Sequence, residues 1–235
     1  MKRDKCDVCG KNLEYATSPT EYRKLNCYFC KNAFEANIFC KDGHYICDSC
    51  HSKDPIVLID EFSKTTKLKD PYEIADYLMQ HPKFKIYGPE HHVLTPVSIL
   101  LALKNNNIKK PNGSDITYLD VKEAINRASK IPGGWCGLYG ACGAGIGSGV
   151  AISVFTNATP STGELRSLAN QMTSRSLNKI ADNLEHCCKR SVKISICETL
   201  EFLKEKFNIN LKYDSKNCKF SLINDKCEKE RCLMF

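Results

Sequence analysis

The residues of this chain that could do chemistry are first of all its cysteines, 15 among 235 residues. Four pairs of metal ligands lie near the N-terminus: Cys6/Cys9, Cys27/Cys30, Cys40/His44 and Cys47/Cys50. A Cys-x-x-Cys turn brings two sulfur atoms within reach of one ion, and zinc takes four such ligands in a tetrahedron. Residues 6–50 are therefore predicted to hold two Zn²⁺ ions in closed, structural sites, which leave no open position for a substrate.

The order of these pairs allows two wirings. In the interleaved wiring the first and third pairs hold one ion and the second and fourth pairs hold the other. In the sequential wiring, neighbouring pairs share an ion. The spacing Cys-x2-Cys-x9-Cys-x3-His-x2-Cys-x2-Cys from Cys27 to Cys50 is typical of RING-type fingers and favours the interleaved form. Rubredoxin-like iron would suit an all-cysteine set equally well.

A second unusual segment, residues 133–149, contains eight glycines together with Cys136 and Cys142. A glycine inside a helix costs up to about 1 kcal/mol relative to alanine, so this density requires a reason. One reason is a close approach of the backbone to a cluster or an anion. The candidate cofactor-binding residues are then Gly137, Gly140, Gly143 and Gly145. The other reason is tight packing between helices, with Cys142 as a small filler.

Five further cysteines could extend this site: the neighbours Cys187 and Cys188, and Cys218, Cys227 and Cys232 in the tail. One of the neighbours could join Cys136 and Cys142 as the third ligand of a [4Fe-4S] cluster. The tail cysteines form a further ligand set that competes for the same role. A cluster held by three cysteines leaves one iron open to a substrate.

Charged and titratable residues close to these cysteines are the candidate catalytic groups: His91, His92, Lys189 and Arg190. Neighbouring side chains usually point apart, so we expect at most one of the two histidines to be functional. The alternative is a capped helix start with both histidines on the surface. Lys189 and Arg190 are most simply cations at a helix end, but they would also favour ligating thiolates beside a cluster.

Two regions must position these residues. We expect residues 1–54 to form the zinc module, with a zinc-ribbon/treble-clef or an interleaved RING-like fold. Residues 55–69 are expected to be a connector, in which the apolar run 56–59 forms one strand. Residues 70–235 are expected to be a mainly α-helical domain with the glycine/cysteine-rich segment and a cysteine-containing tail.

Helix signals fill the second region. Asp70, Pro71 and Glu73 supply an N-cap, a proline at the first helical position and a capping-box carboxylate, in a helix that ends before Pro82. Capping and periodicity predict four further helices. The first begins at Thr95-Pro96 and runs through residue 103, and the others span residues 118–130, 161–184 and 192–207. Ser161 and Glu164 form the expected capping box of the helix at 161–184.

Charge and hydropathy limit the class of partner. The net charge is +7, but residues 1–60 contain nine basic and nine acidic side chains, so the zinc module has no basic surface typical of nucleic-acid binding. No apolar run has the roughly 20 residues of a membrane helix, and the N-terminus is not a secretory signal. A cytoplasmic location follows, where cysteines bind metal rather than form disulfides.

Several phrases together carry a resemblance to a known family: Cys40-Lys-Asp-Gly-His44-Tyr-Ile-Cys47-Asp-Ser-Cys50-His51, Gly88-Pro-Glu-His-His92, Cys136-Gly-Leu-Tyr-Gly-Ala-Cys142-Gly-Ala, Ala158-Thr-Pro-Ser161, Cys187-Cys-Lys-Arg190 and the tail cysteines. The chain resembles, over nearly its whole length, a cysteine-rich domain of unknown function of methanogenic archaea and anaerobic bacteria. Some relatives are linked to S-adenosylmethionine-dependent methyltransferases. The resemblance implies an anaerobic cytoplasm, which suits an oxygen-sensitive cluster, but no activity.

Three classes of function remain after these observations. The first is a metalloprotein of anaerobic metabolism, with structural zinc and an iron–sulfur or thiolate site that acts on a small substrate. The second is a binding module that carries metal, sulfur or a cofactor to a partner methyltransferase or another anaerobic enzyme. The third is a zinc-finger nucleic-acid binder, which would require a basic, aromatic stripe on the fingers. The residues alone name neither a substrate nor an oligomeric state.

Overall fold

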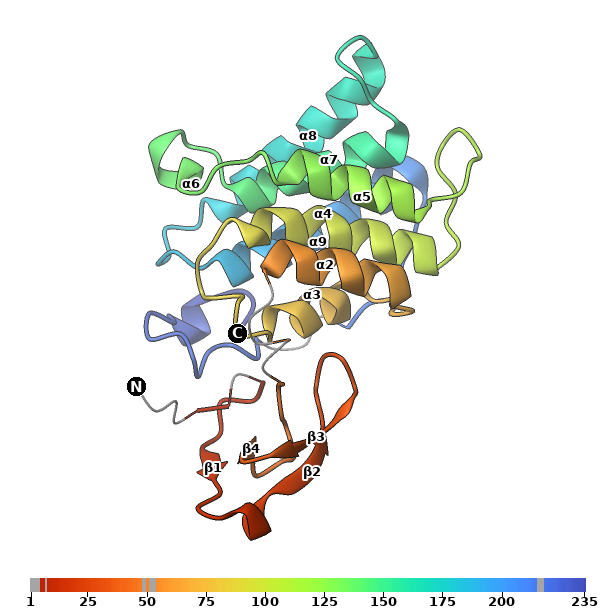
Figure 1. Cartoon of the computed structure of the whole chain (residues 1–235). Coiled ribbons are helices and arrows are strands. Elements are labelled where there is room, and N and C mark those ends of the chain that lie inside the picture. Colours follow the sequence, from red (N-terminus) through yellow and green to blue (C-terminus); the bar gives the residue numbers. More distant parts are fainter. Residues whose placement is uncertain (1–4, 7, 48–49, 51–53, 215–217) are drawn as a thin grey trace. The chain divides into compact units, whose positions relative to one another are not determined.

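The chain divides into two compact units. The structure is a computed structural model that describes residues 5–6, 8–47, 50, 54–214 and 218–235. The first unit comprises residues 1–54 with 80–83, and the second comprises residues 55–79 with 84–235 (Figure 1). In the described residues no helix is both long and apolar enough to cross a membrane.

The first unit is built from two short antiparallel ladders. Strand β1 (Leu13–Tyr15) pairs with β4 (Ile38–Cys40), and β2 (Arg23–Asn26) forms a hairpin with β3 (Ala33–Ala36). A short 3₁₀ helix, η1 (Pro19–Glu21), precedes β2. One cluster of buried residues consists of Cys27, Cys47 and Cys50, with a few half-buried side chains packed against it. A module of this size buries too little apolar surface to be stable by itself, so bound metal is the expected source of its stability.

The segment of residues 80–83 belongs to this first unit by its contacts. The Tyr28 hydroxyl donates to Gln80 Oε1 over 2.7 Å, and His81 Nε2 lies 2.7 Å from the Cys50 carbonyl oxygen. The His81 ring also packs edge-on against Phe29, with 4.4 Å between ring centroids. These contacts surround the turn of the second Cys-x-x-Cys pair.

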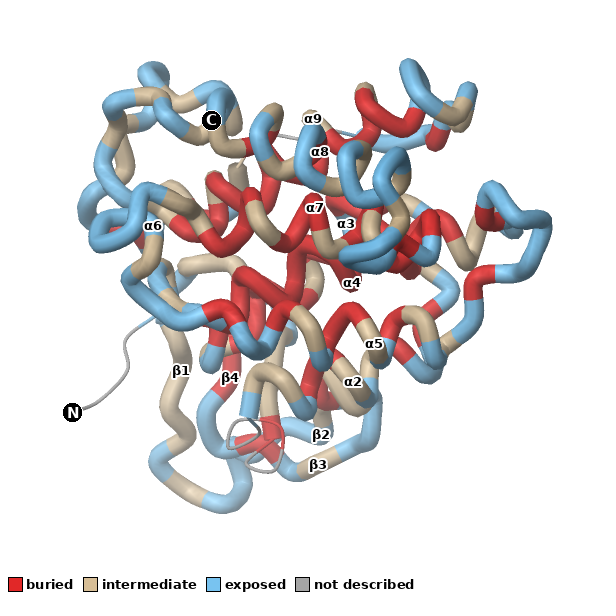
Figure 2. The backbone as a smooth tube through the Cα atoms, turned by 90° about the horizontal axis from the view of Figure 1, so that it is seen from above, coloured by how far each residue is buried: buried red, intermediate tan, exposed pale blue. Residues whose placement is uncertain are grey.

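The second unit is mainly helical, as predicted. Its elements are α2 (Pro55–Thr65), α3 (Pro71–Met79), α4 (Glu90–Asn105), α5 (Tyr118–Ala128), α6 (Trp135–Leu138), α7 (Gly143–Thr156), α8 (Gly163–Ile180), α9 (Cys188–Phe207) and the 3₁₀ turn η2 (Lys229–Arg231). Helix α4 is central, because every residue from Glu90 to Leu103 is buried and α2, α3, α5, α7 and α9 all pack on it. Figure 2 shows buried residues gathered along α4 and α7, while α6 is largely exposed.

The sequence-based expectations for the segments of α2 and α4 are wrong. The apolar run Ile56–Ile59, predicted as a strand, lies in α2, whose buried residues Leu58, Ile59 and Ser63 follow helical spacing. Helix α4 begins at Glu90 rather than at Thr95-Pro96, so Pro96 lies inside the helix. Proline has no N–H to donate to the His92 carbonyl four residues earlier. Helix α7 lies close to this position, because a Cβ at Gly147 would come within 2.7 Å of that carbonyl oxygen.

Helices α8 and α9 also begin where the sequence did not predict. The residue before α8 is Thr162, whose hydroxyl exchanges hydrogen bonds with the backbone of Thr159, so the expected Ser161–Glu164 capping box does not form. Helix α9 begins at Cys188 instead of residue 192, because the cysteine doublet itself starts the helix. The cations that follow the doublet therefore lie at a helix N-terminus, where the helix dipole disfavours them.

Candidate metal centres

The N-terminal ligands form two compact groups in the described residues. One group is Cys6, Cys9, Cys40 and His44, and the other is Cys27, Cys30, Cys47 and Cys50; within each group the ligand atoms lie within 4.8 Å of one another. This is the interleaved grouping, which confirms the wiring that the spacing favoured. Three sulfurs with one nitrogen, or four sulfurs, are donor sets that suit zinc, and either group could hold a metal ion.

Local geometry in both groups suits ligands of one ion. The Cys9 and Cys40 sulfurs are 3.4 Å apart, and those of Cys30 and Cys47 are 3.8 Å apart. Tetrahedral zinc with bonds of about 2.3 Å places its sulfurs roughly 3.8 Å apart. Within the described ranges the Nδ1 atom of His44 is buried without a hydrogen-bond partner, as expected of a nitrogen that faces an ion. Burial raises the pKa of Cys27, but backbone N–H groups facing its sulfur outweigh burial and lower that pKa to about 7.

A separate pocket in the helical unit brings together three further cysteines. Cys136 lies in α6, Cys142 precedes the first residue of α7, and Cys188 is the first residue of α9. All three line one cavity of about 250 Å³, together with His91 and His92. Two segments that are far apart in sequence, residues 136–142 and the start of α9, thus place thiols around one space.

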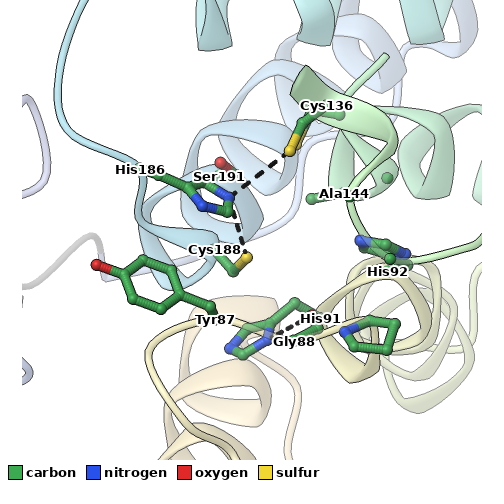
Figure 3. A pocket seen from close by; sticks show the side chains of 14 residues that line it. Tyr87, Gly88, His91, His92, Cys136, Ala144, His186, Cys188 and Ser191 are labelled. Atoms are coloured by element: carbon green, nitrogen blue, oxygen red, sulfur yellow. Dashed lines mark hydrogen bonds between the residues drawn. The ribbon is translucent and has the colours of Figure 1, made fainter. Parts of the chain in front are cut away.

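The His186 ring lies between two of these thiols. Its Nε2 atom is 3.8 Å from the Cys136 sulfur and 3.5 Å from the Cys188 sulfur, and its ring stacks on Tyr87 (Figure 3). In the described residues, the only groups of three ligand atoms within 4.8 Å of one another are in the first unit. The Cys136 and Cys188 sulfurs are therefore more than 4.8 Å apart, which is wider than the zinc-like groups.

The start of α9 affects the charge that the Cys188 thiol can carry. Burial and, to a smaller extent, the neighbouring thiols of Cys142 and Cys187 together raise the pKa of Cys188 to about 12. The free thiol is therefore protonated at neutral pH. The positive ends of α7 and α9 favour a thiolate once a metal replaces that proton.

Both histidines of the first turn of α4 are buried, so the expectation of surface histidines is wrong. Burial lowers the pKa of His91 and of His92, so both are neutral at pH 7. His91 Nδ1 lies 3.1 Å from the Gly88 carbonyl, which can only accept a hydrogen bond, so Nδ1 holds the ring proton. The buried Nε2 of His91 then has a lone pair and no hydrogen-bond partner among the residues that the structure describes.

The glycines of residues 133–149 have two different environments. A Cβ atom at Gly145 would come within 2.8 Å of Leu177, and one at Gly147 within 2.7 Å of the His92 carbonyl oxygen, so these glycines allow close helix packing. Gly143 lies against the His92 ring and lines the pocket. Gly137 and Gly140 have open space beside them and are not among the lining residues. Of the four predicted cofactor-binding glycines, only Gly143 is placed at the pocket.

The remaining predicted site residues lie around a different pocket. Cys187, Cys218, Cys227 and Cys232 line it, together with Lys189 and Arg190. Burial lowers the pKa of Lys189 to about 8, and its ammonium donates to the carbonyls of Met79 (2.7 Å) and Phe84 (2.8 Å). The Arg190 guanidinium pairs with Asp182 at 3.1 Å. Neither cation lines the pocket of Cys136 and Cys188.

Sequence reasoning missed His186, although it directly precedes the cysteine doublet. The run His186-Cys187-Cys188 contains three adjacent candidate ligands, and this density was the available signal. Tyr87 and Ser191 also line the first pocket without having been singled out. Neither residue belongs to a ligand pattern, so only the fold reveals them.

The arrangement defines a cysteine-rich protein with an N-terminal module that could bind two metal ions and a mainly helical second unit. The sequence matches the family of unknown function DUF5714 over residues 46–235, and the chain belongs to that family. The matched region includes every cysteine of the helical unit. No curated protein and no solved structure matches the chain.

Proposed function

We propose that this protein is an iron–sulfur protein in which Cys136, Cys142 and Cys188 hold a [4Fe-4S] cluster with one open iron. The observation that carries the proposal is the convergence of three thiols, two from the glycine-rich segment and one from the start of α9, on one pocket. An iron atom without a cysteine ligand could act as a Lewis acid on a hydroxyl or thiol of a small substrate. The two zinc ions assigned to the N-terminal module would be structural.

The spacing of the thiols supports a cluster over a single ion. The sulfurs of Cys136 and Cys188 are too far apart to belong to a group like those of the first unit. A cubane cluster distributes its thiolates over different irons, so it needs wider spacing than tetrahedral zinc. The cavity of about 250 Å³ is also smaller than a typical drug-sized site, which favours a small substrate.

The buried histidine next to the thiols supports acid–base chemistry in the same pocket. A neutral imidazole with an unpartnered Nε2 can accept a proton from a bound hydroxyl or thiol. His91 is held in that tautomer by the Gly88 carbonyl. We therefore assign His91 the role of general base, and we assign His186 the role of a hydrogen-bond donor to the cluster thiolates.

The test is metal analysis of the anaerobically purified chain after reconstitution with ferrous iron and sulfide. Cys136→Ser, Cys142→Ser and Cys188→Ser should each lose one cluster, measured as iron, sulfide and visible absorption. The matched control is Cys197→Ser, because Cys197 lies on the same helix as Cys188 but packs against the apolar core. Iron content that is unchanged in all three variants would sink the proposal.

The open iron needs its own measurement. Mild oxidation should remove it and leave the EPR signal of a [3Fe-4S] cluster, which a fully ligated cluster resists. His186→Ala should keep the cluster if His186 only donates hydrogen bonds. A complete loss of the cluster in His186→Ala would make His186 the fourth ligand, and the site would then be closed.

A further inference from the structure

The two neighbouring cysteines at the start of α9 line different pockets. Cys188 lines the pocket described above, whereas Cys187 lines the second pocket with Cys218, Cys227 and Cys232. The second pocket therefore contains four thiols, one from a helix start and three from the C-terminal segment. The two sets of cysteines share no residue, so the second set can be considered independently of the cluster proposed above.

Backbone N–H groups face the sulfur atoms of this second set. The N–H of Phe220 donates to Cys218 and the N–H of Met234 donates to Cys232, each over 3.4 Å. The N–H of Asp42 makes the same contact, also over 3.4 Å, with Cys40, which belongs to one of the metal-ligand groups. Cys218 and Cys232 thus have the local geometry of a cysteine that is already placed among metal ligands, and hydrogen bonds of this kind tune the reduction potential of bound clusters.

A buried cation, the Lys189 ammonium, lies beside these thiols. Lys189 is only 1% exposed, its ammonium donates to two backbone carbonyls, and it lies 4.5 Å from the centroid of the Phe220 ring. In the described part of the chain no carboxylate is within ion-pair distance of it, whereas the nearby Lys193 is paired with Asp76 at 3.0 Å. A buried ammonium is costly without an opposite charge. A [4Fe-4S] cluster with four thiolates has a net charge of roughly −2 and would supply it.

The C-terminal segment has very little apolar core of its own. In its described residues from 208 onward, only Leu211, Phe220 and Asn224 are buried, and η2 is the one regular element. Large apolar side chains such as Leu222 and Leu233 are exposed. Such a segment needs a cross-link to keep a fixed position, and metal ligation provides one in small modules.

We infer that Cys187, Cys218, Cys227 and Cys232 bind a second, fully ligated [4Fe-4S] cluster, which anchors the C-terminal segment to the start of α9. The four thiols release their protons to solvent as they ligate iron. A cluster suits them better than zinc, because no three of them meet the 4.8 Å limit that both N-terminal groups satisfy. The pocket that the four cysteines line is narrow, about 20 Å³, so binding of a cluster would require the C-terminal segment to shift outward.

The first experiment compares full-length variants after anaerobic reconstitution with ferrous iron and sulfide. Cys227→Ser and Cys232→Ser should each lose one cluster that resists mild oxidation, while Cys197→Ser keeps the full iron content. Cys136→Ser should retain the cluster that Cys227→Ser loses, so failure of one site is distinguishable from failure of the other. Full iron content in the tail variants would overturn the inference, and so would loss of zinc instead of iron.

The second experiment uses the unaltered protein and so avoids variants that fail to fold. Iron-loaded and chelator-stripped chains are treated with iodoacetamide, and the modified cysteines are identified by mass spectrometry. The four cysteines should be protected in the loaded chain and become reactive after stripping, while Cys197 reacts equally in both samples. Equal modification of Cys218, Cys227 and Cys232 in the two samples would contradict the inference.

Discussion

Replacement of Gly147 by alanine tests whether the glycines of α7 exist for helix packing. A Cβ at this position would lie 2.7 Å from the His92 carbonyl oxygen and 3.0 Å from Pro96 Cδ. Both neighbours belong to the buried helix α4 and cannot rotate away. Pro96 has no N–H to donate to the His92 carbonyl, so that carbonyl faces α7 directly and only a glycine fits beside it.

The magnitude follows from two opposing contributions to the free energy of unfolding. Overpacking a buried contact costs typically 1–3 kcal/mol, and exchange of glycine for alanine inside a helix returns up to about 1 kcal/mol. We therefore expect Gly147→Ala to lower stability by about 1–2 kcal/mol. In a chain of this size that corresponds to a fall in Tm of roughly 2–8 °C.

The assay is thermal unfolding of Gly147→Ala and of the unaltered chain at equal metal loading. Gly163→Ala is the matched control, because Gly163 lies in the first turn of α8 and a Cβ there meets nothing within 4 Å. The control should have an unchanged or slightly higher Tm. A Gly147→Ala variant as stable as the control would refute the close contact between α4 and α7.

Three further predictions concern the metal module and two ion pairs. Native mass spectrometry should find two zinc ions per chain, and Cys40→Ser should lose one of them while Cys197→Ser loses none. Lys193→Ala leaves the buried Asp76 without its partner. It should lower the free energy of unfolding, measured with denaturant, by about 3–5 kcal/mol. The double variant Lys193→Met, Asp76→Asn should lower it clearly less. Burial raises the pKa of Asp120, but the Lys110 ammonium and the hydrogen bonds from Thr117 outweigh burial, and the net pKa is lowered. The ionised carboxylate therefore stabilises the fold fully above about pH 4. The difference in Tm between the unaltered chain and Asp120→Asn should therefore shrink as the pH falls below 4, and a constant difference would count against the pair.

Features set by local chemistry could be predicted from the sequence. The Cys-x-x-Cys pairs are turns of fixed geometry, and their order and spacing were enough to group the ligands correctly. The cap of α3 is equally local: Asp70 accepts a hydrogen bond from the Tyr72 N–H over 2.8 Å, and the helix ends at Met79, before Pro82. In these cases the partners are close in sequence, so tertiary structure cannot override them.

Features that depend on packing could not be predicted. A short apolar run such as Ile56–Ile59 is compatible with a buried strand and with a buried helix. Its packing against α4 and α5 accompanies the helical conformation. Pro96 was predicted to start a helix because proline is favoured in the first turn of a helix. In the structure it lies inside the buried helix α4, where Gly147 of α7 leaves room for its ring. His186 lies between two sulfurs because of where the fold places α6 and α9, which carry the two cysteines. The hydrophobic periodicity of the sequence does not indicate which helices lie close to one another.

The cysteine doublet shows how one helix start can provide ligands in two directions. Cys187 is the N-cap of α9 in an extended conformation, with φ −150° and ψ 103°, while Cys188 is already helical. The change of conformation between the two residues turns their side chains apart, so they contribute to separate pockets instead of competing for one metal. Both sulfurs then lie at the positive end of a 20-residue helix. Lys189 and Arg190 add positive charge where the helix dipole alone would disfavour it, so negative charge close by stabilises the start of α9. Asp182 supplies such charge for Arg190, and thiolates bound to metal would supply it for Lys189.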